Sequence, residues 1–114
     1  MSSIGDRVAR RVHVVSNYVS PEYTAVRHIL TAPILAERCT KHILDEDFAW
    51  DGLMAEAEAM SGGQATMVRV ALDLWSGERA VGVWDLPQRL GPTAFDRVVE
   101  AMQLYRGEAL PVAA

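Results

Sequence analysis

The sequence predicts a mainly α-helical fold, a small bundle of about five to six helices with at most one short β segment near residues 80–84. Two observations lead to this prediction. Apolar residues recur at helical spacing along most of the chain. Capping residues, prolines and glycines then divide it into segments of helix length. The 114 residues suit a single domain over 1–114, which we expect to comprise a helical part at 1–60, a trihelical part at 61–107 and a frayed tail at 108–114.

The first segment carries an apolar stripe at helical spacing. Its members are Ile4, Val8, Val12, Val15 and Val19. Residues 8–19 are rich in β-branched side chains, so a strand is the alternative to a helix there. The next helix is predicted to begin at Ser20-Pro21-Glu22, because serine caps a helix, proline is tolerated in its first turn and glutamate suits its positive end. We expect this helix to bury Val26, Ile29 and Leu30.

Pro33 separates that helix from a second one, because proline inside a helix costs about 3 kcal/mol. The second helix is predicted over residues 33–46, with Ile34, Leu35 and either Ile43 or Leu44 buried. A third helix is predicted over residues 47–60. We expect its inward side chains to be Trp50, Leu53 and Met54, and its outward side chains to be Glu56 and Glu58.

The C-terminal half has clearer boundaries. A helix is predicted from Gly62 to Trp75, ended by a left-handed Gly77. Its apolar face contains Met67, Val68, Ala71, Leu72 and Trp75. A short strand at residues 80–83 and a brief helix capped by Asp85 are expected to follow. Thr93, with Asp96 three residues later, is predicted to cap a last helix that ends at Gly107. The apolar stripe of this last helix contains Phe95, Val98, Val99, Met102 and Tyr105.

Composition restricts the cellular setting. The net charge of −4 disfavours unspecific binding to nucleic acid, although a local basic face is compatible with it. Cys39 is the only cysteine, so an internal disulfide is impossible. The sequence shows neither a signal-peptide core nor an apolar run of about 20 residues. We therefore expect a cytoplasmic protein without a membrane partner, and the excess of alanine, valine and arginine suggests a bacterial or phage source.

Chemically reactive side chains are few. Cys39, His42 and Asp45 or Glu46 are ligand types that zinc accepts, on adjacent turns of a predicted helix. Strong zinc motifs pair two such clusters, and only His13 and His28 remain for a second one. Cysteine and histidine on one helix also lack the geometry of a catalytic pair. We expect no metal, no cofactor and no enzymatic activity.

The stretch Ser61-Gly62-Gly63-Gln64 suggests two interpretations. "SGGQATMVRVALDLWSG" resembles the signature motif and helix of ABC-type ATPases, and "AVGVWDLP" resembles their Walker B strand, with Asp85 in place of the magnesium-binding aspartate. This resemblance implies a nucleotide contact at Ser61–Gln64. However, the chain contains no G-x-x-x-x-G-K-[ST] motif, and Leu86 stands where the catalytic glutamate would follow. The sequence favours a capping box, in which Ser61 caps the helix and Gln64 reaches back to the Ser61 amide.

Residues 66–107 are predicted to form three helices, of which the first and last are long and the middle one is short. This order also fits a degenerate helix-turn-helix, with residues 92–106 as the recognition helix. The outward residues of that helix would be Thr93, Ala94, Asp96, Arg97, Glu100, Gln103 and Arg106. Arg7, Arg10 and Arg11 would form a basic arm, supplemented by Arg69, Arg79 and Arg89. Because two acids offset two arginines on the recognition helix, DNA binding is the alternative and not the first hypothesis.

The first hypothesis is a small non-enzymatic intracellular regulatory or adaptor protein that binds a partner protein, with a homodimer as one form of this hypothesis. Trp84 lies beside Asp85 and Pro87 in a predicted turn, where tryptophan often anchors an interface. The candidate contact residues are Trp84, Asp85, Arg89 and Arg97. The nucleotide contact at Ser61–Gln64 is a distant alternative.

Overall fold

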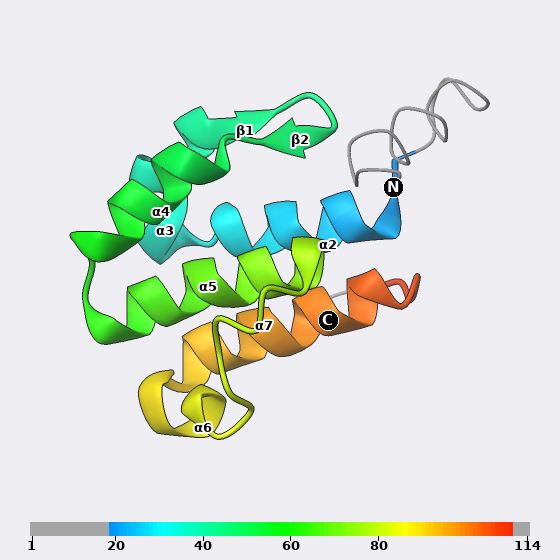
Figure 1. The fold of residues 1–114 in the computed structure, drawn as a ribbon. Helices are drawn as coiled ribbons and strands as arrows, with labels where there is room; N and C mark the ends of the chain where they lie inside the picture. Colours follow the sequence, from blue (N-terminus) through cyan, green and yellow to red (C-terminus); the bar gives the residue numbers. More distant parts are fainter. Residues whose placement is uncertain (1–18, 111–114) are drawn as a thin grey trace.

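The computed structural model describes residues 19–110, and within them it confirms a mainly helical fold with one short two-stranded sheet (Figure 1). The predicted stripe from Ile4 to Val15 and the arginines at 7, 10 and 11 lie outside these residues. None of the helices within 19–110 is long and apolar enough to cross a lipid bilayer.

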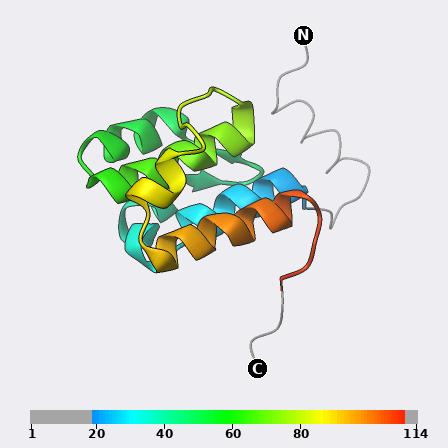
Figure 2. The same cartoon turned by 90° about the horizontal axis from the view of Figure 1, so that it is seen from below.

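Helix α2 (Pro21–Leu30) is the central element of the bundle. It begins as predicted, because the Ser20 hydroxyl accepts a hydrogen bond of 3.0 Å from the Tyr23 backbone N–H. Val26, Ile29 and Leu30 are fully buried, which confirms the predicted core face. Helices α5 and α7 both pack against α2, so the N-terminal and C-terminal parts share one hydrophobic core (Figures 1 and 2).

The predicted helix over residues 33–46 is wrong in its second half. Helix α3 (Pro33–Cys39) ends at Cys39, and a 3₁₀ turn η1 (Thr40–His42) leads into a hairpin of β1 (Ile43–Leu44) and β2 (Asp47–Phe48). Ile43 pairs with Phe48, and Leu44 pairs with Asp47. The turn between the strands places Glu46 at a φ of +66°, which glycine or asparagine usually adopts. The sequence of this turn contains none of the residue pairs that are typical of a β-hairpin.

The hairpin is held in place by an aromatic cluster and one hydrogen bond. The Phe48 ring stacks on Tyr23 at 5.0 Å between centroids and meets the edge of Trp75 at 5.1 Å. The Tyr23 hydroxyl donates to the Leu44 carbonyl at 2.6 Å. These tertiary contacts are absent from any local sequence pattern, which explains why a helix was predicted here. The predicted burial of Ile34 is also wrong, because its side chain is 58% exposed.

Helix α4 (Trp50–Glu58) begins three residues later than predicted and packs against α5. Leu53 is fully buried as expected, with Trp50 and Met54 partly buried beside it. Glu56 does not point freely outward as predicted, because it pairs with Lys41 at 3.0 Å and with His42 at 3.1 Å.

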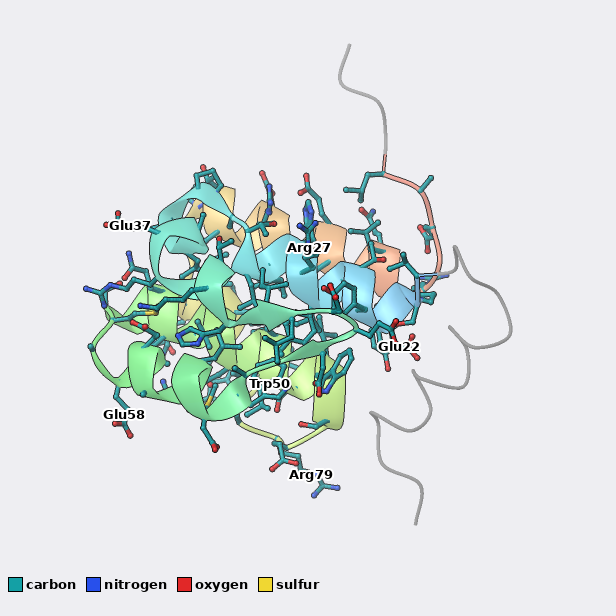
Figure 3. All side chains as sticks on the ribbon, turned by 90° about the horizontal axis from the view of Figure 1, so that it is seen from above. Glu22, Arg27, Glu37, Trp50, Glu58 and Arg79 are labelled. Carbon is teal, nitrogen blue, oxygen red and sulfur yellow. The ribbon has the colours of Figure 1, made fainter. Side chains whose placement is uncertain are left out.

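The Glu58 side chain points away from the bundle, as predicted, and so do the side chains of Glu37 and Arg79 on other segments (Figure 3).

Helix α5 (Gly62–Ser76) matches the prediction to within one residue, and Gly77 adopts the predicted left-handed conformation with φ +66°. The predicted strand at residues 80–83 is wrong. This segment is an irregular connection to the short helix α6 (Asp85–Arg89), which begins directly at Asp85. The sheet of the structure lies instead at residues 43–48.

Helix α7 (Pro92–Tyr105) begins with Gly91 as its N-cap, so the predicted cap at Thr93 is wrong. The helix is also rotated relative to the predicted stripe. Its buried residues are Val98 and Ala101, whereas three of the predicted apolar residues are more than a third exposed: Val99, Met102 and Tyr105. Conversely, Arg97 and Glu100, which were expected to face outward, contact α2.

Candidate functional site

The most exposed large apolar side chains in the described part of the chain are adjacent, at Val83 and Trp84. Val83 is 84% exposed and Trp84 is 67% exposed, at the end of the connection between α5 and α6. Neighbouring apolar side chains that are exposed to this degree are typical of an interaction surface.

Two aspartates fix the shape of this connection. The Asp73 carboxylate in α5 accepts hydrogen bonds from the Ala80 N–H at 2.8 Å and from the Val81 N–H at 3.0 Å. The Asp85 carboxylate accepts from the Gly82 N–H at 3.0 Å and from Arg89 Nε at 3.3 Å. Three consecutive backbone N–H groups are therefore bound to α5 or α6, which orders the connection before any partner arrives.

Gly82 leaves room for the Trp84 ring in its observed position. A Cβ atom at residue 82 would lie 2.8 Å from Nε1 of Trp84, closer than such atoms approach. The indole therefore lies against the glycine backbone, with most of its surface in solvent.

A groove of about 140 Å³ lies between α5, the connection, α6 and α7. It is lined almost entirely by apolar side chains, among which Met102 comes from α7 and Leu86 from α6. Its lining residues are Val70, Asp73, Leu74, Val81, Gly82, Val83, Leu86 and Met102. Val99 and Met102, each 37% exposed, extend the apolar character along α7. We call Val83, Trp84, Leu86, Val99 and Met102 the apolar surface.

The four predicted contact residues are only partly brought together. Trp84, Asp85 and Arg89 belong to one structural unit, since Asp85 binds both the Gly82 N–H and Arg89. Arg97 lies elsewhere: its Nε donates to the His28 carbonyl at 2.7 Å and its Nη2 donates to Thr31 Oγ1 at 3.4 Å. Its guanidinium satisfies carbonyl and hydroxyl groups at the end of α2, as a basic side chain does at a helix C-terminus. Arg97 is therefore engaged in contacts between α7 and the end of α2.

Sequence reasoning missed Asp73, Gly82, Val83, Leu86, Val99 and Met102 as parts of this surface. An aspartate four residues before a helix-ending glycine was the available signal for Asp73, because its carboxylate can reach the amides that follow the helix. Val99 and Met102 were assigned to the core, since an apolar residue next to a buried helix face carries no signal of its own exposure.

The start of α5 is used for packing. Ser61 Oγ accepts a hydrogen bond of 3.4 Å from the Gln64 N–H, whereas the reciprocal bond of a capping box is not formed between these two residues. A Cβ atom at Gly63 would lie 3.1 Å from the Arg89 carbonyl oxygen, and one at Gly62 would lie 3.6 Å from Arg89 Nη1. The absence of a side chain at Gly63 therefore allows the end of α6 to approach the first turn of α5 closely, whereas a Cβ atom at Gly62 would make an ordinary van der Waals contact.

Cys39 is buried, and His42 takes part in an ion-paired cluster beside it. Burial, with a smaller contribution from nearby Glu56, raises the pKa of the Cys39 thiol to about 11, so the thiol stays protonated at neutral pH. His42 shares Glu56 with Lys41, and these two partners lower the pKa of the Glu56 carboxyl by hydrogen bonding. Within residues 19–110 no group of three histidine, cysteine or acidic side chains is arranged to hold a metal ion. His13 lies outside these residues.

Comparison with protein-family models, with curated proteins and with solved structures found no match for this chain. Functional inference therefore depends on the geometry of the apolar surface.

Proposed function

We propose that this protein is a non-enzymatic adaptor or regulatory protein that binds a partner protein through the apolar surface. The observation that carries the proposal is the pair Val83 and Trp84, which are exposed side by side on a connection that two aspartates hold in one conformation. Exposed tryptophan is enriched among the residues that dominate binding energy. An ordered connection adds to this, because little conformational entropy is lost when the partner binds.

The groove beside Trp84 suits a particular kind of partner. Its lining is apolar, with Asp73 as the one charged residue, and the Asp73 carboxylate is already occupied by two backbone N–H groups. A partner therefore gains free energy mainly by placing apolar side chains over the groove and Trp84, at roughly 25 cal/mol for each Å² removed from water. An amphipathic helix presents such side chains at regular spacing.

Site-specific photocrosslinking tests this proposal. A benzophenone amino acid replaces Trp84 in the full chain, which is expressed in living cells, and the matched control carries the same group at Glu78, an exposed position in the same connection. We expect a protein–protein adduct at position 84 that excess wild-type chain suppresses and excess Trp84→Ser chain does not. The absence of any adduct at position 84 beyond that at position 78 would refute the proposal.

A further inference from the structure

We propose that the partner at the apolar surface is a second copy of this chain, and that two α7 helices pack antiparallel about a two-fold axis. This inference rests on the proposed function, because it names the partner of the same surface.

The first argument is the spacing of the outer side chains of α7. Val99, Met102 and Arg106 follow one another at intervals of three and four residues along the exposed side of the helix, and Phe95, four residues before Val99, is partly buried against the core. This is the spacing of the seam along which two helices pack in a coiled coil. Val99 and Met102, in the middle of this seam, are each 37% exposed although they are apolar. A second helix laid along the seam would remove both from water.

The second argument is the placement of charge along that seam. Asp96 flanks its start and Arg106 lies at its end, ten residues later, which is about 15 Å along a helix. The Asp96 side chain makes no hydrogen bond or ion pair with another residue of the described range, and Arg106 is 78% exposed beside Glu108 at 3.0 Å.

These two charges select one orientation. Residues 96 and 106 are equally distant from residue 101, so a two-fold axis at the level of Ala101 brings each Asp96 level with Arg106 of the second copy. A parallel arrangement would instead place Asp96 against Asp96 and Arg106 against Arg106, which is unfavourable. The pair Asp96 and Arg106 is therefore complementary to its copy only in the antiparallel sense.

The Val83–Trp84 pair would extend this interface. Val83 and Met102 line the same groove, so the connection borders the seam. In a symmetric dimer every contact occurs twice, and the apolar area contributed by Val83 and Trp84 is therefore doubled.

Charge reversal combined with sedimentation equilibrium tests the inference on the full chain. We expect the wild-type chain to dimerise, and Asp96→Arg and Arg106→Asp each to weaken the dimer about tenfold, because each creates two like-charge contacts. The double variant Asp96→Arg/Arg106→Asp restores opposite charges and should return the dissociation constant to within about threefold of the wild-type value. Glu58→Arg, the same charge change on an exposed position of α4, is the control and should have no effect.

Circular dichroism melting establishes that each variant is folded. A wild-type chain that remains monomeric at every concentration would overturn this inference, and so would a dimer that responds to neither single reversal or that the double variant fails to restore. The outcome for the proposed function can be distinguished from the outcome for this inference. A monomeric chain that still forms a specific adduct with another protein at position 84 would refute only the second copy as partner.

Discussion

The Arg97 guanidinium in α7 donates through Nε to the backbone carbonyl of His28 in α2, over a distance of 2.7 Å. Beside it, His28 Nε2 lies 2.7 Å from Glu100 Oε1. These contacts lie on the side of α7 that faces α2. Val98 and Ala101 are buried in the same packing, which leaves Val99 and Met102 partly exposed. The rotation of α7 that exposes these two residues is therefore accompanied by polar contacts on the other side of the helix.

Replacing Arg97 by alanine should lower the free energy of unfolding by about 1.5–3 kcal/mol, the usual range for hydrogen bonds that involve a charged group. The change removes donors to the His28 carbonyl and to Thr31. Urea unfolding measures it. Arg69→Ala is the control, because the Arg69 side chain forms no hydrogen bond or ion pair within the described residues. Equal effects of the two substitutions would contradict the role given to Arg97.

Asp73→Ala should release the connection that carries Trp84. The Asp73 carboxylate is the acceptor for the N–H groups of Ala80 and Val81. Amide hydrogen exchange measured by NMR should therefore accelerate at these two residues in the variant and stay unchanged at Ile29 in α2. Asp51→Ala, at an exposed position of α4, is the matched control. Protection at Ala80 that persists in Asp73→Ala would show that other contacts order the connection.

The Glu56 carboxylate should make stability depend on pH in the acidic range. Its pKa is lowered by hydrogen bonds from His42 and Lys41, so the folded chain binds the proton on Glu56 less readily than the unfolded chain. The contribution of Glu56 is therefore complete above the unfolded pKa of about 4.3 and disappears as pH falls through the lower folded value.

Urea unfolding of the wild-type chain and of Glu56→Gln over a pH series checks this. We expect the wild-type chain to be the more stable at neutral pH and the difference to shrink below about pH 4.3. A difference that stays constant through the acidic range would contradict the assignment.

Ser61→Ala should cost about 1 kcal/mol of stability through the loss of a helix cap. The Ser61 hydroxyl accepts the Gln64 N–H at the first turn of α5. ATP with magnesium should not raise the melting temperature of the wild-type chain, because the sequence contains no phosphate-binding G-x-x-x-x-G-K-[ST] loop. Thermal stabilisation by millimolar nucleotide that Ser61→Ala abolishes would restore the nucleotide hypothesis.

The parts of the fold that local chemistry determines were predictable from the sequence. Ser20 places a helix boundary through its hydroxyl, and Pro33 and Gly77 do so through their backbone preferences; the structure has boundaries at all three. The hairpin at residues 43–48 was not predictable, since contacts of Phe48 with Tyr23 and Trp75 stabilise it and its turn lacks glycine.

Of the candidate site, the exposure of one residue was predictable from the sequence, and the exposure of its neighbours was not. The position of Trp84 beside Asp85 and Pro87 in a turn predicts a surface residue, and it is 67% exposed. The exposure of Val99 and Met102 depends on the rotation of α7 against α2, which involves contacts between residues far apart in sequence, such as Arg97 with His28. Sequence spacing alone assigns both residues to the core.

The central claim is tested most directly by the affinity of the Trp84→Ser variant for the partner that photocrosslinking at position 84 identifies. The dissociation constant is measured for the wild-type chain and for Trp84→Ser, with the melting temperature of each recorded. If Trp84 anchors the interface, the substitution weakens binding about 30-fold or more, the equivalent of a hot-spot loss of about 2 kcal/mol, and leaves stability within about 0.5 kcal/mol. An unchanged dissociation constant for a folded Trp84→Ser chain would contradict the account.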